Sequence, residues 1–358
     1  MLSLDRVLRV MRVKLLILPI LAAVSPDIFT EMSTEVLAAG QQAPAGERAK
    51  QETPTFTISV NLIKIPVSVF DQNGAPVADL HASDFRISED GIPQEIRSFG
   101  IDRNPVSVVL VLDASATVEH ESKKIRQAAR DFVGALSKED RFSVISFSDS
   151  AILLLDWTDN EKRVQKSLRD LESGIRTALY DAMFMAGEDQ LRGIDGRKAI
   201  ILLTDALNNQ SRATFGQAAQ AIIQSQASLY VVSKTVMVRK AAKTQRRVLW
   251  LDSVYRRLTG DANYVDEFFE KKEKEMTELA EKTGGRCLFP PDFNAIGNAY
   301  AQIAEELKNQ HFLTYVSNQT MTPDSYHKIT VEYLRPAAKI IYRQGYYHQP
   351  TPVRRPRR

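Results

Sequence analysis

The pattern of apolar and polar positions first changes to a strand-like one at about residue 55. Residues 57–70 are rich in β-branched side chains and partly alternate between apolar and polar, as in half-buried strands. Asn73-Gly74 and Asp90-Gly91 are turn signals, and the alternating segments 85–89 and 94–99 lie next to them. Residues 55–103 are therefore predicted to form a small all-β module.

After residue 104 the pattern changes to one of strands and helices in turn. Residues 106–112 form a nearly continuous apolar run, as expected of a strand buried on both faces, and residues 119–136 carry apolar side chains at helical spacing. This alternation predicts an α/β fold with a doubly wound, mostly parallel sheet over residues 104–317. Further strands are expected at 142–147, 152–155, 199–203, 228–233 and 312–316, and further helices at 161–171, 178–190, 215–226, 271–282 and 295–309.

Two segments depart from this alternation. Residues 235–269, basic between Arg239 and Arg257, are predicted to be a partly helical insertion over one edge of the sheet. Residues 318–347 contain strand patterns at 328–333 and 339–342 and are interpreted as a C-terminal β-hairpin. Because chain ends often lie close together, this hairpin is expected to pair with the N-terminal β-module.

The N-terminus resembles an export signal. Basic residues precede the apolar run 15–24, which is too short to span a bilayer as a helix. We interpret residues 1–40 as a signal peptide or leader and residues 41–54 as a linker, so the protein is expected to be exported, with no transmembrane span in the mature chain. The alternatives are an uncleaved anchor and a hydrophobic start that is not a signal. The expected location is the periplasm, the cell envelope or outside the cell.

Charge and cysteine content narrow the function classes. The net charge of +3 depends on Arg354, Arg355, Arg357 and Arg358 in the basic tail 348–358, and the rest of the chain is nearly neutral. Nucleic-acid-binding proteins usually carry a basic face on the folded body, so nucleic acid is not an expected partner. The single cysteine, Cys287, is predicted to be a packed, inert thiol because no activating base is near it in sequence.

Oxygen-bearing side chains follow the predicted strands at three places. Asp113, Ser115 and Thr117 follow the first buried strand, Asp205 follows another, and Thr177 lies between them in sequence. Ligands of doubly wound sheets bind outside the carboxyl ends of the strands, so distant loops would converge there. The simpler alternative is that Asp113, Ser115 and Thr117 only cap the helix that follows.

These residue types suit a hard divalent cation. Carboxylates and hydroxyls supply oxygen ligands, which Mg²⁺ takes in octahedral geometry together with waters; Mn²⁺ and Ca²⁺ are alternatives. Two carboxylates would balance one divalent ion and leave a coordination position for an acidic side chain of a partner.

The sequence here resembles the von Willebrand factor A family, whose metal-ion-dependent adhesion site reads Asp-x-Ser-x-Ser, then a distant Thr, then a distant Asp. It resembles more narrowly the exported "VWFA-related" proteins of acidobacteria, which carry a preceding β-module like residues 67–91. The resemblance implies that Asp113, Ser115, Thr117 and Thr177 are ligands and that Asp205 acts directly or through a water. Thr117 replaces the usual Ser, and Ala116 and Ala206 stand where Gly is frequent.

The leading hypothesis is an exported adhesion or binding protein that uses a divalent cation to bind a protein or glycan, with no catalysis. The sequence contains no phosphate-binding loop, no His-Glu-x-x-His and no Gly-x-Ser-x-Gly, and its five histidines are scattered. Two alternatives remain open: a metal-free structural or assembly module of the cell envelope, and an enzyme or a subunit of an enzyme complex.

Overall fold

The computed structural model describes residues 61–115, 122–244, 264–319, 322, 324–336 and 339–348. All of them belong to one compact unit, Ile58–Arg358. The predicted leader and linker, Thr117 and the basic tail from residue 349 lie outside the described residues.

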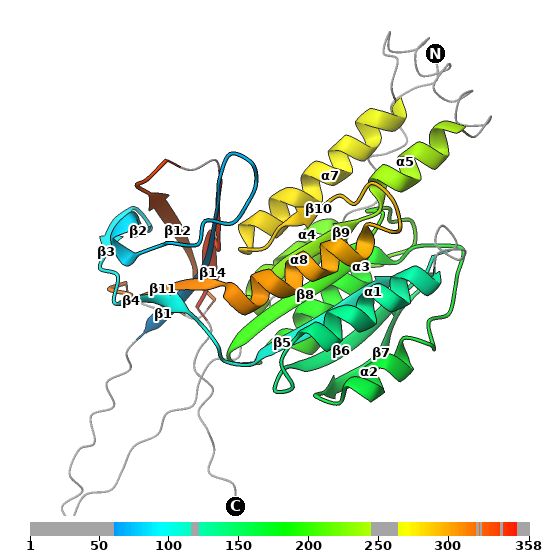
Figure 1. Cartoon of the computed structure of the whole chain (residues 1–358), viewed down its shortest axis with the longest axis horizontal. Coiled ribbons are helices and arrows are strands. Elements are labelled where there is room, and N and C mark those ends of the chain that lie inside the picture. Colours follow the sequence, from blue (N-terminus) through cyan, green and yellow to red (C-terminus); the bar gives the residue numbers. More distant parts are fainter. Residues whose placement is uncertain are drawn as a thin grey trace, which may run out of the picture. The chain divides into compact units, whose positions relative to one another are not determined.

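A six-stranded sheet forms the larger part of the fold, in the order β10-β9-β8-β5-β6-β7 (Figure 1). Neighbouring strands are parallel except β7, which pairs antiparallel with β6 at the edge. All residues of β5 and β9 are buried, which explains their continuous apolar sequence. The predicted α/β class with a mostly parallel sheet is confirmed. The strands are β5 (Val106–Asp113), β6 (Arg141–Phe147), β7 (Ala151–Thr158), β8 (Arg197–Thr204), β9 (Ser228–Ser233) and β10 (Cys287–Leu288).

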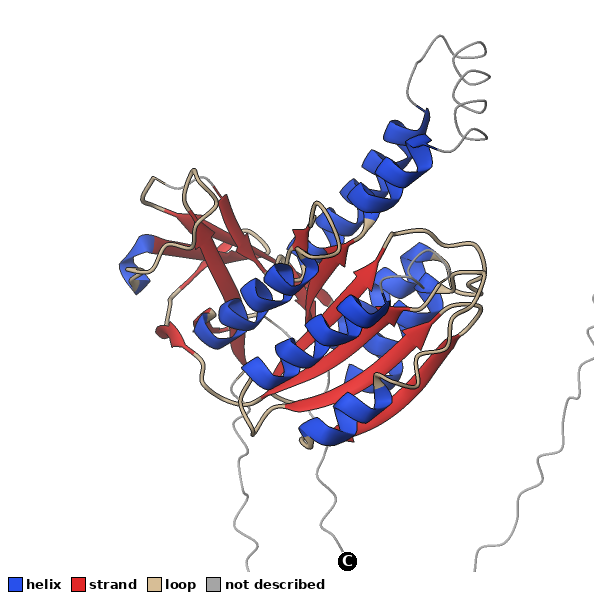
Figure 2. Cartoon of the chain, turned by 45° about the vertical axis from the view of Figure 1, so that its right-hand side comes forward, coloured by secondary structure: helices blue, strands red, loops and turns tan. Residues whose placement is uncertain are grey.

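Helices cover both faces of this sheet (Figure 2). Side chains alternate along β5, so Val108 and Leu110 join one core cluster while Val109 and Val111 join the other. The first cluster includes residues of α1 (Ser122–Ala135), α2 (Glu161–Ser167) and α8 (Ile296–Asn309). The second includes residues of α3 (Leu179–Phe184), α4 (Phe215–Ser225) and α7 (Tyr264–Lys282).

The helix predicted over 178–190 consists of two parts. It begins as α3 and continues as a π-helix, Met185–Leu191, which packs against α4. Gly187 permits this close packing, because a Cβ there would lie 2.6 Å from the backbone carbon of Ala221.

The remaining strands form two four-stranded antiparallel sheets around a separate apolar core. Their orders are β13-β1-β11-β4 and β14-β12-β2-β3, and Ile65, Phe85, Leu313 and Ile329 belong to the core between them. A short 3₁₀-helix, Ala82–Asp84, precedes β2. The strands are β1 (Leu62–Phe70), β2 (Phe85–Glu89), β3 (Ile92–Gln94), β4 (Ser98–Ile101), β11 (His311–Val316), β12 (Tyr326–Tyr333), β13 (Lys339–Tyr342) and β14 (Gly345–Tyr347).

The C-terminal strands pair with the N-terminal module as expected, but not as a hairpin. β12 pairs with β2 and β13 pairs with β1, so the two strands lie in different sheets and the predicted hairpin is wrong. β11, which the sequence pattern placed with the α/β fold, pairs with β1 and β4. The two strands pack against the same small core from different sheets, a relationship that spacing along the chain does not reveal.

The segment predicted as an insertion begins with α5 (Thr235–Thr244), and α7 starts at Tyr264, seven residues before its predicted start. The two helices lie side by side (Figure 1), and Arg239 pairs with Asp266 and Glu273 of α7, each at 3.8 Å. Within the described residues no helix is both long and apolar enough to cross a membrane.

Candidate functional site

Asp113 and Asp205 lie at the carboxyl ends of two adjacent central strands. Leu112 of β5 pairs with Leu203 of β8, so Asp113 is level with Thr204 and next to the turn that holds Asp205. Both aspartates are buried, with 3% and 1% of their surfaces exposed. Since carboxylates are rarely buried without compensating partners, this part of the sheet is specialised for polar contacts.

Each aspartate is oriented by the turn that follows it. The Ser115 N–H donates to Asp113 Oδ1 at 2.8 Å, and the Leu207 N–H donates to Asp205 Oδ1 at 3.0 Å. Ala206, which lies between Asp205 and Leu207, has a φ of +60°, a conformation that favours glycine. The turns therefore help to orient both carboxylates.

The loop that carries Thr177 is held against the same edge. Ser115 forms a β-bridge with Gly174, and Asp149 Oδ1 accepts from the N–H groups of Ile175 at 3.1 Å and Arg176 at 2.6 Å. A Cβ on Gly174 would lie 2.7 Å from the side chain of Ser148, so only glycine fits there.

Thr177 is also tied to the loop after β8. Its N–H donates to Asn209 Oδ1 at 2.8 Å, and its carbonyl accepts from the N–H groups of Asn209 at 3.1 Å and Gln210 at 3.2 Å. Thr177 itself is 5% exposed. The structure thus brings four of the five sequence-predicted residues, Asp113, Ser115, Thr177 and Asp205, to one edge of the sheet. Thr117 lies outside the described residues.

A lysine that the sequence analysis did not nominate occupies the same edge. Lys234 directly follows β9, and its N–H donates to the Thr204 carbonyl at 2.7 Å. Its ammonium lies 2.8 Å from Asp113 Oδ2, and both side chains are fully buried. One of the two carboxylates therefore already has an opposite charge in direct contact.

The donor chemistry fits a divalent cation, but the charge balance differs from the one expected. Asp113, Ser115, Thr177 and Asp205 supply oxygen donors suited to Mg²⁺. The described residues contain no cluster of three His, Cys, Asp or Glu side chains placed to hold a metal, so an ion here would depend on hydroxyl oxygens. Lys234 offsets one of the two negative charges, which predicts weak affinity for a cation.

Residues 108–208 match the family model of the von Willebrand factor type A domain. The chain contains a von Willebrand factor type A (VWA) domain. The matched residues include Asp113, Ser115, Thr177 and Asp205, and end before Lys234. No curated protein matches the chain in sequence.

Three solved structures illustrate the likeness of the fold. A von Willebrand factor type A protein from Catenulispora acidiphila is 10% identical, with a TM-score of 0.42 over 78% of this chain and 73% of that one. The vWF domain of the type V pili tip protein Mfa5 from Porphyromonas gingivalis is 12% identical, with a TM-score of 0.41 over 58% of this chain and 95% of that one.

Proximal thread matrix protein 1 from the mussel byssus, in a form with a zinc-occupied MIDAS motif, is 11% identical. Its TM-score is 0.43, over 61% of this chain and 49% of that one, so this chain spans about half the length of the mussel protein.

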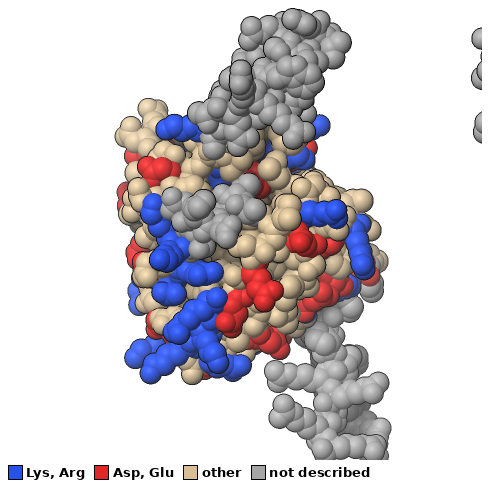
Figure 3. All heavy atoms as spheres, turned by 90° about the vertical axis from the view of Figure 1, so that its right-hand side faces the viewer, with Lys and Arg blue, Asp and Glu red and all other residues tan. Residues whose placement is uncertain are grey.

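We call the edge of the sheet that holds Asp113, Ser115, Thr177 and Asp205 the VWA site. An exposed apolar side chain and unevenly distributed charged side chains lie around it. Ile175, two residues before Thr177, is 87% exposed, the largest value among the exposed large apolar residues of the described part. Basic side chains gather to one side of this end of the molecule, with acidic ones beside them (Figure 3). The adjacent helices α1 and α2 together carry seven Lys or Arg residues and two acidic ones.

Lys234, Asn209, Asp149 and Ile175 were missed by the sequence analysis. Lys234 had a usable signal, because it directly follows a buried strand, the placement that nominated Asp113 and Asp205. Asp181 of α3 accepts from the N–H groups of Arg212 and Ala213 and so holds the loop between β8 and α4.

Proposed function

We propose that this protein is an exported binding protein whose VWA domain recognises an acidic partner at the carboxyl edge of its sheet, with a divalent cation held weakly among Asp113, Ser115, Thr117, Thr177 and Asp205. The observation that carries the proposal is the convergence of four of these residues, from three separate loops, at one buried edge. The proposal involves no catalysis.

Convergence of this kind favours a binding site over helix capping. A cap needs only the residues before one helix, whereas Thr177 and Asp205 come from elsewhere in the chain. Asp149, Gly174 and Asn209 hold the loops together, so the donors are fixed before any ligand arrives. Such preorganisation lowers the entropic cost of binding.

The bound cation would supply a positively charged coordination position for a carboxylate of the partner. Residues of the chain would supply the other contacts with the partner and the attraction that brings it to the site. The side chain of Ile175 projects into solvent beside the site and would contact apolar surface of the partner. The basic helices α1 and α2 would attract an acidic partner during approach.

Mg²⁺ is the proposed ion because hydroxyl and carboxylate oxygens are its usual protein ligands; Mn²⁺ and Ca²⁺ share this preference for oxygen. Export and a location in the periplasm, the envelope or outside the cell are part of the proposal and rest on the basic and apolar pattern of residues 6–24. A protein or glycan could present the acidic group.

A second candidate function is supported by the Lys234–Asp113 ion pair. A fully buried ammonium against the first aspartate keeps the edge of the sheet assembled without a metal ion. This favours a metal-free structural or assembly module of the cell envelope as the alternative.

Capture of partners from envelope extracts distinguishes the two. Immobilised wild-type protein is compared with Asp205→Asn and with Asp159→Asn, an exposed carboxylate just after β7 at the opposite end of the sheet. The proposal predicts that a chelator and Asp205→Asn each release the same captured species, whereas Asp159→Asn does not. Capture that neither treatment changes would favour the metal-free module.

A further inference from the structure

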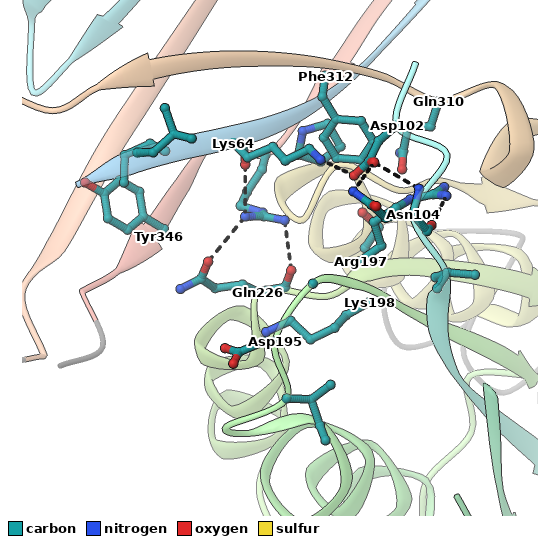
Figure 4. Close-up of a pocket in the computed structure, with 18 of the residues that line it drawn as sticks. Lys64, Asp102, Asn104, Asp195, Arg197, Lys198, Gln226, Gln310, Phe312 and Tyr346 are labelled. Carbon is teal, nitrogen blue, oxygen red and sulfur yellow. Dashed lines mark hydrogen bonds and ion pairs between the residues drawn. The ribbon is translucent and has the colours of Figure 1, made fainter. Parts of the chain in front are cut away.

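A cavity lies at the opposite end of the six-stranded sheet from Asp113 and Asp205. Its volume is about 540 Å³, and its walls come from the start of β8, from β1 and from the turn between β13 and β14. Figure 4 shows Lys64 of β1, Arg197 and Lys198 of β8, and Gln226 after α4 around it. The cavity therefore lies between the α/β fold and the antiparallel sheets.

The cationic side chains that line this cavity outnumber the acidic ones. Lys64, Arg197, Lys198 and Arg343 face Asp102 and Asp195, and Lys64 pairs with Asp102. In the described part of the chain neither Lys198 nor Arg343 forms an ion pair. The walls thus retain positive charge that no carboxylate contacts.

Arg343 is held by neutral acceptors alone. Its guanidinium donates to the Gln226 carbonyl at 2.8 Å, to Gln226 Oε1 at 3.4 Å and to the Lys64 carbonyl at 3.5 Å. Its Nε is buried and has no hydrogen-bond partner among the described residues. An arginine head held by neutral groups keeps a positive charge that no contacting carboxylate compensates, and such a charge favours an anion nearby.

The lowered pKa of Lys198 is consistent with the same lack of a contacting carboxylate. Burial and the nearby charge of Arg343 lower the pKa of Lys198 to about 8, and burial lowers the pKa of Arg343 to about 10. Asp195 acts on Lys198 in the opposite direction but does not contact it. Two partly buried cations held near each other destabilise the empty cavity, and an anion would relieve this repulsion.

We propose that this cavity binds a small organic anion whose phosphate or carboxylate group contacts Lys198 and Arg343. A volume of about 540 Å³ lies within the range of small-molecule sites, roughly 300–1,000 Å³. Phe312 and Tyr346 line other parts of the wall and offer apolar surface to the rest of the ligand. This inference is independent of the proposed function of the opposite edge.

Calorimetric titration of the full chain with inorganic phosphate and, separately, with citrate tests the inference, with ionic strength held constant by chloride. Wild-type protein is expected to bind at least one of the two, and the preferred anion identifies the group that the site accepts. Lys198→Gln is expected to weaken that binding about tenfold or more, because a charge-assisted hydrogen bond is lost. Lys328→Gln, which removes an exposed lysine on β12, is the matched control and should bind like wild type.

Thermal unfolding distinguishes a variant that has lost the anion site from one that has failed to fold. Lys198→Gln removes a partly buried charge, so its Tm without anion should equal or exceed that of wild type, and the anion should raise the Tm of wild type alone. The inference is overturned if neither anion binds wild type, or if Lys198→Gln binds as tightly as wild type does.

Discussion

Lys234 Nζ lies 2.8 Å from Asp113 Oδ2, and neither side chain is exposed to solvent. The pair joins the end of β5 to the residue after β9, across the intervening strand β8. Two buried charges in contact are far more stable than either one alone, because a lone buried charge has lost its hydration without compensation. Lys234 thus makes the metal-free state of this edge a stable one.

Lys234→Met tests this role directly. The substitution keeps an unbranched side chain but leaves Asp113 as a buried, uncompensated charge, so we expect the free energy of unfolding to fall by about 3–5 kcal/mol. Denaturant unfolding with a chelator present measures the change.

The matched control is the double variant Asp113→Asn/Lys234→Met, in which neither charge remains. Its loss in the free energy of unfolding should be smaller than the sum of the losses in Asp113→Asn and Lys234→Met. Each single variant leaves one buried charge without its partner, whereas the double variant leaves none. Additive losses would show that the ion pair contributes no coupling.

The single variant Lys234→Met should also change how the protein responds to metal ions. A divalent cation can take over compensation of Asp113 once Lys234 is gone, and a ligand that binds only the folded state raises its stability. We expect Mg²⁺ to raise the Tm of Lys234→Met more than that of wild type. An equal shift for both proteins would argue against competition between the ammonium and the ion.

Ile175 provides a test of partner binding that is separate from the metal. Because its side chain is 87% exposed, Ile175→Ser should leave the Tm unchanged. If the side chain contacts the partner, its loss should weaken capture by about 1 kcal/mol or more, roughly fivefold. Quantitative capture assays measure this effect, and undiminished capture would remove Ile175 from the proposed contact surface.

Ala206 should tolerate a change to glycine with little change in stability. Its φ of +60° costs an alanine roughly 1–2 kcal/mol, but glycine has greater freedom in the unfolded chain and lacks the buried methyl group of Ala206, which is 1% exposed. Because these effects oppose each other, Ala206→Gly is expected to change the free energy of unfolding by less than about 1 kcal/mol. A clear loss in chemical denaturation would contradict this reading of the turn.

Cys287 should be unreactive in the folded protein. Burial raises the pKa of its thiol to about 12, above its usual value of 9.0, so little thiolate is present near neutral pH. Alkylation at pH 8 should be about a thousandfold slower in the native state than in denaturant. Similar rates in both states would show that the thiol is accessible.

The sequence predicted those site residues whose positions follow from strand ends. Asp113 and Asp205 were nominated because each follows a buried strand, and parallel neighbours bring such ends together. Thr177 lies on a loop between helices, and the family resemblance suggested it; the Ser115–Gly174 bridge is what holds it in place.

The sequence shows that Lys234 directly follows a buried strand, but it does not show the role of Lys234, because that role depends on burial of the side chain. A lysine before a helix is usually solvated, whereas this one is fully buried and contacts Asp113 at the end of β5. The pairing of β12 with β2 and of β13 with β1 was hidden for a similar reason. Both strands alternate correctly, but the choice of partner is made by a core shared between two sheets.

Calorimetric titration of Mg²⁺ into the purified chain tests the central claim most directly. Asp205→Asn is the informative variant, because it removes a proposed ligand charge without breaking the Lys234–Asp113 pair, and Asp159→Asn is its control. The account predicts weak, saturable heats for wild type and Asp159→Asn that disappear in Asp205→Asn. Heats that are the same in all three proteins, or absent from wild type, would contradict it.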